Sequence, residues 1–238
     1  MARKILTDPG TSATNNAFKN GTNYTTVRNA AAAASITDDN KLTLNAKSGS
    51  NFFVRRGIVV YDFTGTFGVS NIKVQRAYLL LSDTIVAAGQ TNGDKIRVGW
   101  LHNPNTLGSI HVNDYNQARA LAANFTSEQA VANGADNAVI KLNNATLLRK
   151  LEKAINNHSY LHLMIRSQLD YANTTPTAAN GSKVWFDGIG DTFNDDLKLV
   201  IVYKKQGSRT NAGRPRSSSS GMSETHISAG TKSGFGGF

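Results

Sequence analysis

The amino-acid sequence predicts a mainly β protein: a single jelly-roll-like β-sandwich with one or two short covering helices and extended N- and C-terminal arms. Segments rich in β-branched and aromatic residues recur between about residues 51 and 205, separated by turn-forming glycine, serine and asparagine. No stretch of linker composition interrupts them. With 238 residues, 39% of them hydrophobic, the chain has enough apolar material for one large core.

Residues 1–50 differ in composition from the segments that follow. Threonine, asparagine, serine and alanine dominate them, as in NAAAAAS at 29–35, and the only clear alternation is KLTLNA at 41–46. This composition predicts an extended N-terminal arm with one or two short strands.

Strand patterns begin at Phe52. The segments FFVRRGIVVYDF (52–63) and VQRAYLLLSD (74–83) predict two buried strands with a turn between them. The segment DKIRVGWLH (94–102) predicts a half-buried strand, because its apolar residues alternate onto one face: Ile96, Val98 and Trp100.

Two short helices are expected next. In VNDYNQARALAANF (112–125), Asn113 or Asp114 can serve as the N-cap of an alanine-rich helix. NATLLRKLEKAINN (144–157) spaces its apolar residues along one helical face: Leu147, Leu148, Leu151, Ala154 and Ile155. Strand character returns in YLHLMIRS, KVWFD and LKLVIVYKK, which complete a sandwich domain over residues 51–205.

Residues 206–238 form a serine- and glycine-rich tail with almost no aliphatic residues, a composition typical of a flexible segment. The tail ends in Phe235 and Phe238 set among glycines, and it carries Arg214 and Arg216. We expect the two phenylalanines to act as anchors on a partner and the two arginines to contact acidic faces. A tail that binds nothing is the alternative.

Charge and cysteine content restrict the function classes. The 26 basic and 16 acidic residues give a formal net charge of +10, which suits an acidic partner. Because the positive charge is spread over the chain, it is also typical of an ordinary soluble surface. The absence of cysteine excludes disulfides and thiol chemistry. The start of the chain lacks the apolar core of a secretory signal, and no window is apolar enough to span a membrane. Nucleic acid is not favoured as a partner, because most aromatic residues lie in expected core strands.

No arrangement of residues predicts catalysis, a metal site or a cofactor. His158 and His162 are four residues apart, but His162 falls in an alternating strand and has no carboxylate nearby before Asp170. Asp187 and Asp191 offer oxygens to calcium but lack the ligand spacing of an EF-hand loop. We therefore expect a protein that is not an enzyme.

The order of the segments resembles the DNRLRE-type, carbohydrate-binding-module-like β-sandwich family. The resemblance covers about residues 50–204 and rests on the following segments: RRGIVVYDFTGTF with its Tyr61-Asp62-Phe63 step, IKVQRAYLLLS, NATLLRKLEKAIN, SYLHLMIRSQLDYANTTP, KVWFDG and DDLKLVIVY. It implies a β-sandwich that either binds an extracellular polysaccharide or has a structural role in a surface protein.

The segment SQLDYANTTP, at the end of one predicted core strand, has two interpretations. Asp170 and Asn173 can make the turn hydrogen bonds that end the strand. Alternatively, a glycan-facing loop is formed by four residues: Asp170, Tyr171, Asn173 and Trp185.

The absence of an export signal conflicts with an extracellular role, and a bacteriophage virion removes the conflict because its parts assemble in the host cytoplasm. We therefore expect a non-catalytic virion structural protein (a head decoration, fibre or tail-associated component) that forms a homo-oligomer and contacts other virion proteins. A carbohydrate-binding module that binds a cell-surface glycan is the alternative.

Overall fold

The computed structural model describes residues 2–7, 14–37, 46–65, 71–81, 84–86, 95–101, 104, 107–117, 125–130, 138–177, 184–186 and 197–206. The chain divides into two units, Met1–Gly207 and Ser208–Phe238. The second unit lies outside the described residues. The expected contacts of Arg214, Arg216, Phe235 and Phe238 therefore stay predictions.

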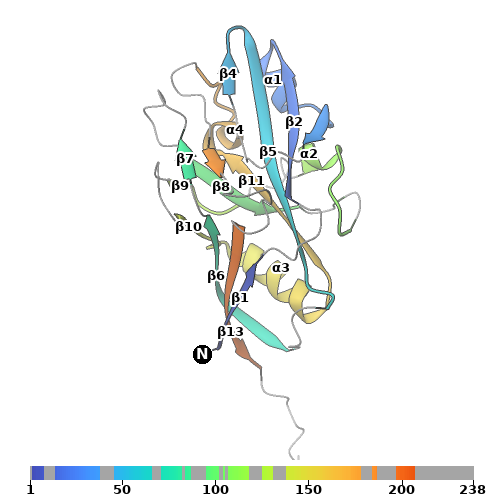
Figure 1. Ribbon diagram of the computed structural model, residues 1–238, viewed down its shortest axis with the longest axis vertical. Helices are drawn as coiled ribbons and strands as arrows, with labels where there is room; N and C mark the ends of the chain where they lie inside the picture. Colours follow the sequence, from blue (N-terminus) through green and yellow to red (C-terminus); the bar gives the residue numbers. More distant parts are fainter. Residues whose placement is uncertain are drawn as a thin grey trace, which may run out of the picture. The chain divides into compact units, whose positions relative to one another are not determined.

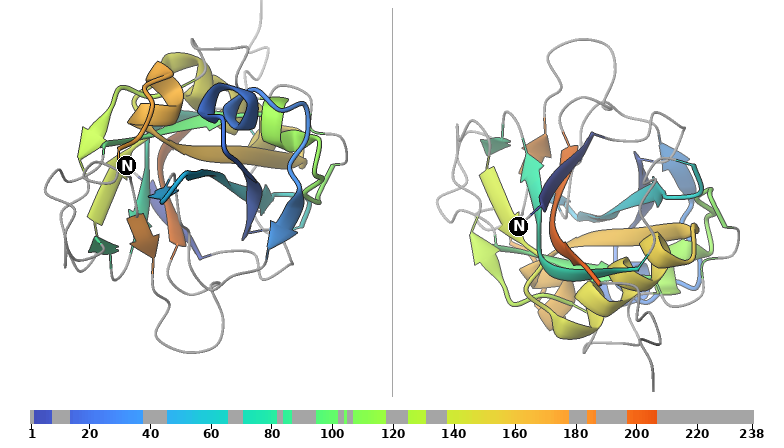
Figure 2. Two further views of the ribbon diagram at one scale, coloured as in Figure 1. Left: turned by 90° about the horizontal axis from the view of Figure 1, so that it is seen from above. Right: turned by 90° about the horizontal axis from the view of Figure 1, so that it is seen from below.

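The first unit is a β-sandwich, as the sequence predicts, built from two antiparallel sheets (Figures 1 and 2). The smaller sheet has four strands in the order β1 (Ala2–Thr7), β13 (Leu197–Lys205), β6 (Ile72–Leu81) and β10 (Ala138–Lys141). The views along the long axis show β1, β13 and β6 side by side. The first and last strands of the unit are thus neighbours.

The larger sheet has seven strands, and the twelve-residue strand β5 (Asn51–Asp62) is its centre. β5 pairs on one side with β2 (Thr14–Gly21), and on the other with β4 (Ala46–Ser48) at its start and β11 (Tyr160–Ser167) farther along. The sheet is completed by β3 (Ser35–Thr37), β8 (Lys95–Trp100) and β9 (Gln129–Ala130). A separate two-stranded sheet joins β7 (Thr84–Val86) to β12 (Val184–Phe186).

The main core lies between the two sheets. The inward side chains of β5 and β11, such as Val59 and Leu163, meet those of β6 and β13, such as Leu79 and Ile201. Helix α3 (Ala145–Asn156) contributes the face that its spacing predicts: Leu147, Leu151, Ala154 and Ile155 are all buried. The Asn144 side chain caps this helix by accepting from the backbone N–H groups of Thr146 and Leu147.

A second core covers the opposite face of the larger sheet. The alternate residues of β5 and β11, including Val54, Ile58 and Met164, point to this side. Three short helices with Tyr24 and Tyr115 cover them: α1 (Tyr24–Arg28), α2 (Asp114–Gln117) and α4 (Gln168–Ala172). Both faces of the larger sheet are therefore buried, which explains the nearly continuous apolar sequence of its central strands.

The described part of residues 1–50 does not form the extended arm that the sequence predicts. Its strands belong to both sheets, since β1 pairs with β13 over six residues and β2 pairs with β5 over eight. Ala17, Tyr24 and Val27 are buried in the second core. The sequence predicted one or two short strands here but not their pairing within the two sheets, because the partners that stabilise them are distant in sequence.

Side chains of α3 occupy the edge of β6 that β10 leaves uncovered. The Asn156 amide accepts from the Ile72 backbone N–H at 2.9 Å and donates to the Ile72 carbonyl at 2.9 Å, as a neighbouring strand would. Glu152 accepts from the Val74 N–H at 2.9 Å. The helix thus satisfies backbone groups that would otherwise remain unpaired at a sheet edge. Within the described residues, no helix has the length and apolarity needed to cross a membrane.

Candidate functional site

The segment SQLDYANTTP ends a core strand, as one of the two interpretations predicts, but it does so by entering a helix. Strand β11 stops at Ser167, whose hydroxyl accepts from the Asp170 N–H at 3.0 Å and caps α4. Asn173 ends α4 in the left-handed conformation with φ of 57°, which asparagine tolerates better than most residues.

Both interpretations of the segment are wrong about the Asp170 side chain, because it is fully buried. Its carboxylate neither faces solvent nor makes a surface turn. Arg56 donates from Nε to Oδ2 at 2.8 Å and from Nη2 to Oδ1 at 2.9 Å, and Arg166 donates from Nε to Oδ2 at 2.8 Å. A carboxylate held in this way is unavailable to a glycan or a substrate.

Three arginines occupy neighbouring strands of the larger sheet. Arg166 of β11 is registered with Arg97 of β8. On the other side of β11, Ile165 is registered with Gly57 of β5. Arg166, the next residue of β11, therefore lies beside Arg56 of β5. Like charges on adjacent strands destabilise a sheet. Asp170 supplies the counter-charge for Arg56 and Arg166, whereas Arg97 donates to the Gln168 side chain at 2.6 Å.

A further arginine attaches the N-terminal segment to the same cluster. Arg28, at the end of α1, donates from Nε to the Asp170 carbonyl at 2.7 Å, and its own carbonyl accepts from Arg56 Nη2 at 2.9 Å. Arg56 also donates to the Tyr115 carbonyl and stacks on the Tyr115 ring, 4.1 Å from its centre. We call Arg28, Arg56, Arg166 and Asp170 the arginine cluster; it connects α1, β5, β11 and α4.

The ionisation of the arginine cluster follows from its burial and its charges. Burial alone raises the pKa of Asp170, but the positive charges of Arg56 and Arg166 outweigh it and hold that pKa well below its usual range. Burial raises the pKa of the Tyr24 and Tyr115 phenols, which stay protonated. Asp170 is therefore ionised at neutral pH, and every member of the arginine cluster has partners within the fold.

The other residues of the expected glycan-facing loop do not assemble around Asp170. The Tyr171 ring is half-buried, with the Arg97 guanidinium 4.1 Å from its centre and the Phe125 ring at 5.5 Å. Asn173 is exposed. Trp185 lies in β12 of the two-stranded sheet, registered with Ile85, and not in the larger sheet.

The two histidines near the start of β11, His158 and His162, do not form a pair. His158 lies in an exposed turn with φ of 49°, whereas His162 is buried within β11, where its Nε2 accepts from the Gly108 N–H at 3.3 Å. Burial lowers the pKa of His162. The described part of the chain holds no group of three or more histidine, aspartate or glutamate side chains that could bind a metal. Asp187 and Asp191 lie outside it.

Several apolar side chains reach the surface on the outer face of the smaller sheet. Strand β6 was expected to be buried, but only alternate residues such as Ala77 and Leu79 point into the core. The side chains on the other face form a groove of about 300 Å³, lined by Tyr78, Leu80, Val139, Val200 and Val202. Val139 is 51% exposed, and Val200 forms the buried floor. We call these five residues the apolar groove.

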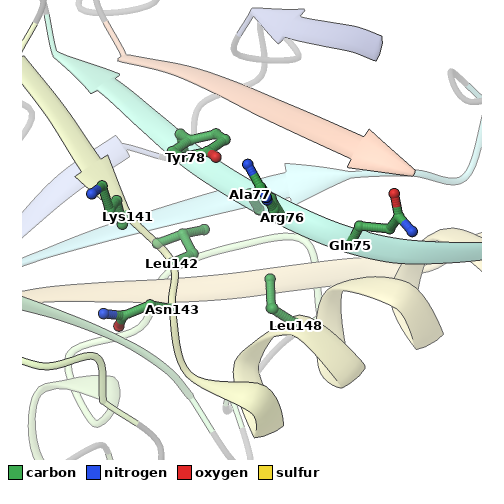
Figure 3. A pocket seen from close by; sticks show the side chains of 8 residues that line it. All are labelled: Gln75, Arg76, Ala77, Tyr78, Lys141, Leu142, Asn143 and Leu148. Atoms are coloured by element: carbon green, nitrogen blue, oxygen red, sulfur yellow. The ribbon is translucent and has the colours of Figure 1, made fainter. Parts of the chain in front are cut away.

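A second hollow, the polar pocket, adjoins the apolar groove where β10 leaves β6 and leads into α3 (Figure 3). It has a volume of about 390 Å³ and is lined by Gln75, Arg76, Ala77, Tyr78, Lys141, Leu142, Asn143 and Leu148. Tyr78 lines both hollows. A β-bulge shapes the polar pocket: Val202 is registered with Arg76 and Tyr203 with Val74, so Gln75 is the extra residue of β6.

The charges around these hollows have one sign. Alternation along the strands places five basic residues on the outer face of the smaller sheet: Lys73, Arg76, Lys141, Lys198 and Lys204. None of them takes part in an ion pair with another described residue. None of the described residues that line the apolar groove or the polar pocket is acidic.

Sequence reasoning missed this surface and the arginine cluster. A signal for the cluster was available, because Arg56 and Arg166 each interrupt an apolar strand. For the outer face no local signal exists, since an apolar run such as AYLLL is equally typical of a strand covered on both sides.

No family model matches the chain, and no curated protein matches it. The fold and the surface define a cysteine-free β-sandwich with one partly apolar, basic outer face. The resemblance to the DNRLRE-type family stays a prediction.

Proposed function

We propose that this chain is a non-catalytic structural component of a bacteriophage virion, such as a head decoration, fibre or tail-associated protein, that assembles through the outer face of its smaller sheet. The apolar groove carries the proposal. Apolar side chains gathered on one face of a folded unit are typical of interaction surfaces, because burying them against a partner removes them from water.

Two features of the described residues agree with a structural role. The buried Asp170 is engaged by arginines and connects four elements of the fold. The unit is also built from both of its ends, because β1 and β13 are neighbours in one sheet.

Particle association is tested directly. Particles from a lysate that contains the protein are purified on a density gradient and labelled with an antibody against residues 51–205. We expect the protein to sediment with the particles and the antibody to label them at regular positions. Protein that remains at the top of the gradient as a monomer, with unlabelled particles, would overturn the proposal.

A carbohydrate-binding module is the second candidate, and the polar pocket favours it. Gln75 and Asn143 bring carboxamide groups to a pocket that also contains the aromatic ring of Tyr78. Carboxamides and aromatic rings are groups that bind sugar hydroxyls and sugar faces. Binding of the isolated monomer to a glycan array, lost on Gln75→Ala or Asn143→Ala, would support this candidate over the structural one.

A further inference from the structure

The apolar groove and the polar pocket differ in chemistry although they adjoin. The groove is lined by four aliphatic residues and Tyr78, and the pocket adds two cations and two carboxamides. Because Tyr78 lines both, a single extended partner segment can occupy the two hollows together. The two hollows therefore fit a segment with a bulky apolar side chain next to polar or charged side chains.

The sign of the charge on that segment follows from the cations of the outer face. Arg76 and Lys141 line the polar pocket and have no acidic partner among the described residues. Helix α3 begins at Ala145, just beyond the pocket residue Asn143, and the N-terminal end of a helix is also positive. The surface is thus complementary to carboxylates.

The same charges decide between possible occupants. The tail of this chain, residues 206–238, has four basic residues and one acidic residue, a net charge of +3, so repulsion disfavours it. A second copy that presents the same basic face meets the same repulsion. Nucleic acid would neutralise the cations but would leave the aliphatic groove without an apolar partner.

We infer that the outer face of the smaller sheet binds an acidic segment of a neighbouring virion protein; this inference rests on the proposed structural role. One bulky apolar side chain of the segment fills the apolar groove, and its flanking carboxylates lie against Arg76 and Lys141. The partner is thus defined by its chemistry: an apolar anchor within a run of aspartate or glutamate.

Fluorescence anisotropy on the full chain tests the inference with three labelled probes. The first is a short peptide with a central Leu-Phe pair flanked on both sides by glutamates. The second has glutamines in place of the glutamates, and the third is an oligothymidylate of the same net charge as the first. We expect only the first probe to bind, with an affinity that falls as salt is added.

Variants on the two hollows separate their contributions. Val139→Asn removes an exposed apolar side chain from the groove, and the double change Arg76→Gln with Lys141→Gln removes the charges of the pocket. We expect each to weaken binding about tenfold. The matched control is Arg149→Gln, because Arg149 is exposed on α3 and lines neither hollow. A circular dichroism spectrum and melting curve for each variant show that the fold is intact.

Three results would overturn the inference: equal binding of the glutamine peptide, equal binding of the oligothymidylate, or binding by folded variants that matches the control. Failure of the peptide experiment leaves the particle test untouched. If the protein sediments with particles but binds none of the probes, the inference is wrong and the structural proposal still stands.

Discussion

Arg56 and Asp170 form an ion pair with two hydrogen bonds in the interior of the protein, and both side chains are fully buried. The two residues are 114 positions apart in the sequence. Their pairing joins the central strand of the larger sheet to the short helix that follows β11. Because breaking a buried pair leaves an uncompensated charge, this contact is more sensitive to substitution than an exposed pair.

Asp170→Asn should lower the free energy of unfolding by about 3 to 5 kcal/mol, because the buried Arg56 and Arg166 side chains would lose their counter-charge. Urea denaturation followed by circular dichroism measures the change. The control is Glu128→Gln, which disrupts the exposed pair with Lys95 and should leave the unfolding curve unchanged. An Asp170→Asn protein as stable as the parent would show that the arginine cluster does not depend on this carboxylate.

The stability of the protein should depend on pH through Asp170. The pKa of Asp170 is lower in the folded protein than in the unfolded chain, where it is about 3.9. The ionised carboxylate therefore stabilises the fold at pH values above about 3.9, and this contribution is lost as the pH falls through the pKa of the folded state. The difference in unfolding free energy between the parent and Asp170→Asn should therefore be constant from pH 7 to about pH 5 and shrink below about pH 4. Urea curves at each pH measure it. A difference that grows on acidification would contradict the assigned direction.

Asn156→Ala should lower the free energy of unfolding by about 1 to 3 kcal/mol, because the Ile72 N–H and carbonyl lose their side-chain partner at the edge of β6. Asn157→Ala is the matched control, since Asn157 is the next residue and is exposed. Native-state hydrogen exchange provides an independent measurement, in which the Ile72 amide should lose protection in the first variant only. Equal loss in both variants would mean that the helix end as a whole, and not the Asn156 amide, protects this edge.

Removal of residues 1–13 should lower the melting temperature and promote aggregation, because it removes β1 and exposes the edge of β13. Differential scanning calorimetry and light scattering measure the two effects. An unchanged melting temperature would restore the view that these residues form a dispensable arm.

Removal of residues 208–238 should leave the melting temperature unchanged, because this segment is a separate unit from Met1–Gly207. It should nevertheless abolish incorporation into particles if Phe235 and Phe238 anchor the protein to its neighbours. Density-gradient sedimentation of particles formed with the shortened chain tests this. Normal incorporation would show that the tail is a passive extension.

Much of the sandwich could be predicted from local patterns. The alternation in β8 and the apolar runs in β5, β11 and β13 indicated strands, and the spacing of Leu147, Leu151 and Ile155 indicated α3. These elements depend on side-chain periods of two and 3.6 residues, which are visible within a single segment. One or two short strands were expected within residues 1–50, but the positions of β1 and β2 could not be predicted, because their stability comes from pairing with β13 and β5, which local composition does not report.

The candidate site could be predicted less well than the fold. Asp170 lies in a polar stretch that resembles a loop, and only the register of β11 against β5 and β8 brings arginines to it. Tyr78 and Leu80 lie in an apolar run that suits a covered strand, and only the arrangement of the layers leaves them at the surface.

By itself, the sequence determined the strand and helix periods, the absence of thiol chemistry and the excess of positive charge. The tertiary structure decided which strands become neighbours, which arginines are buried around Asp170, and which face of β6 meets solvent. The physical reason is that periodicity depends on a few adjacent residues, whereas burial and charge pairing depend on residues that only folding brings together.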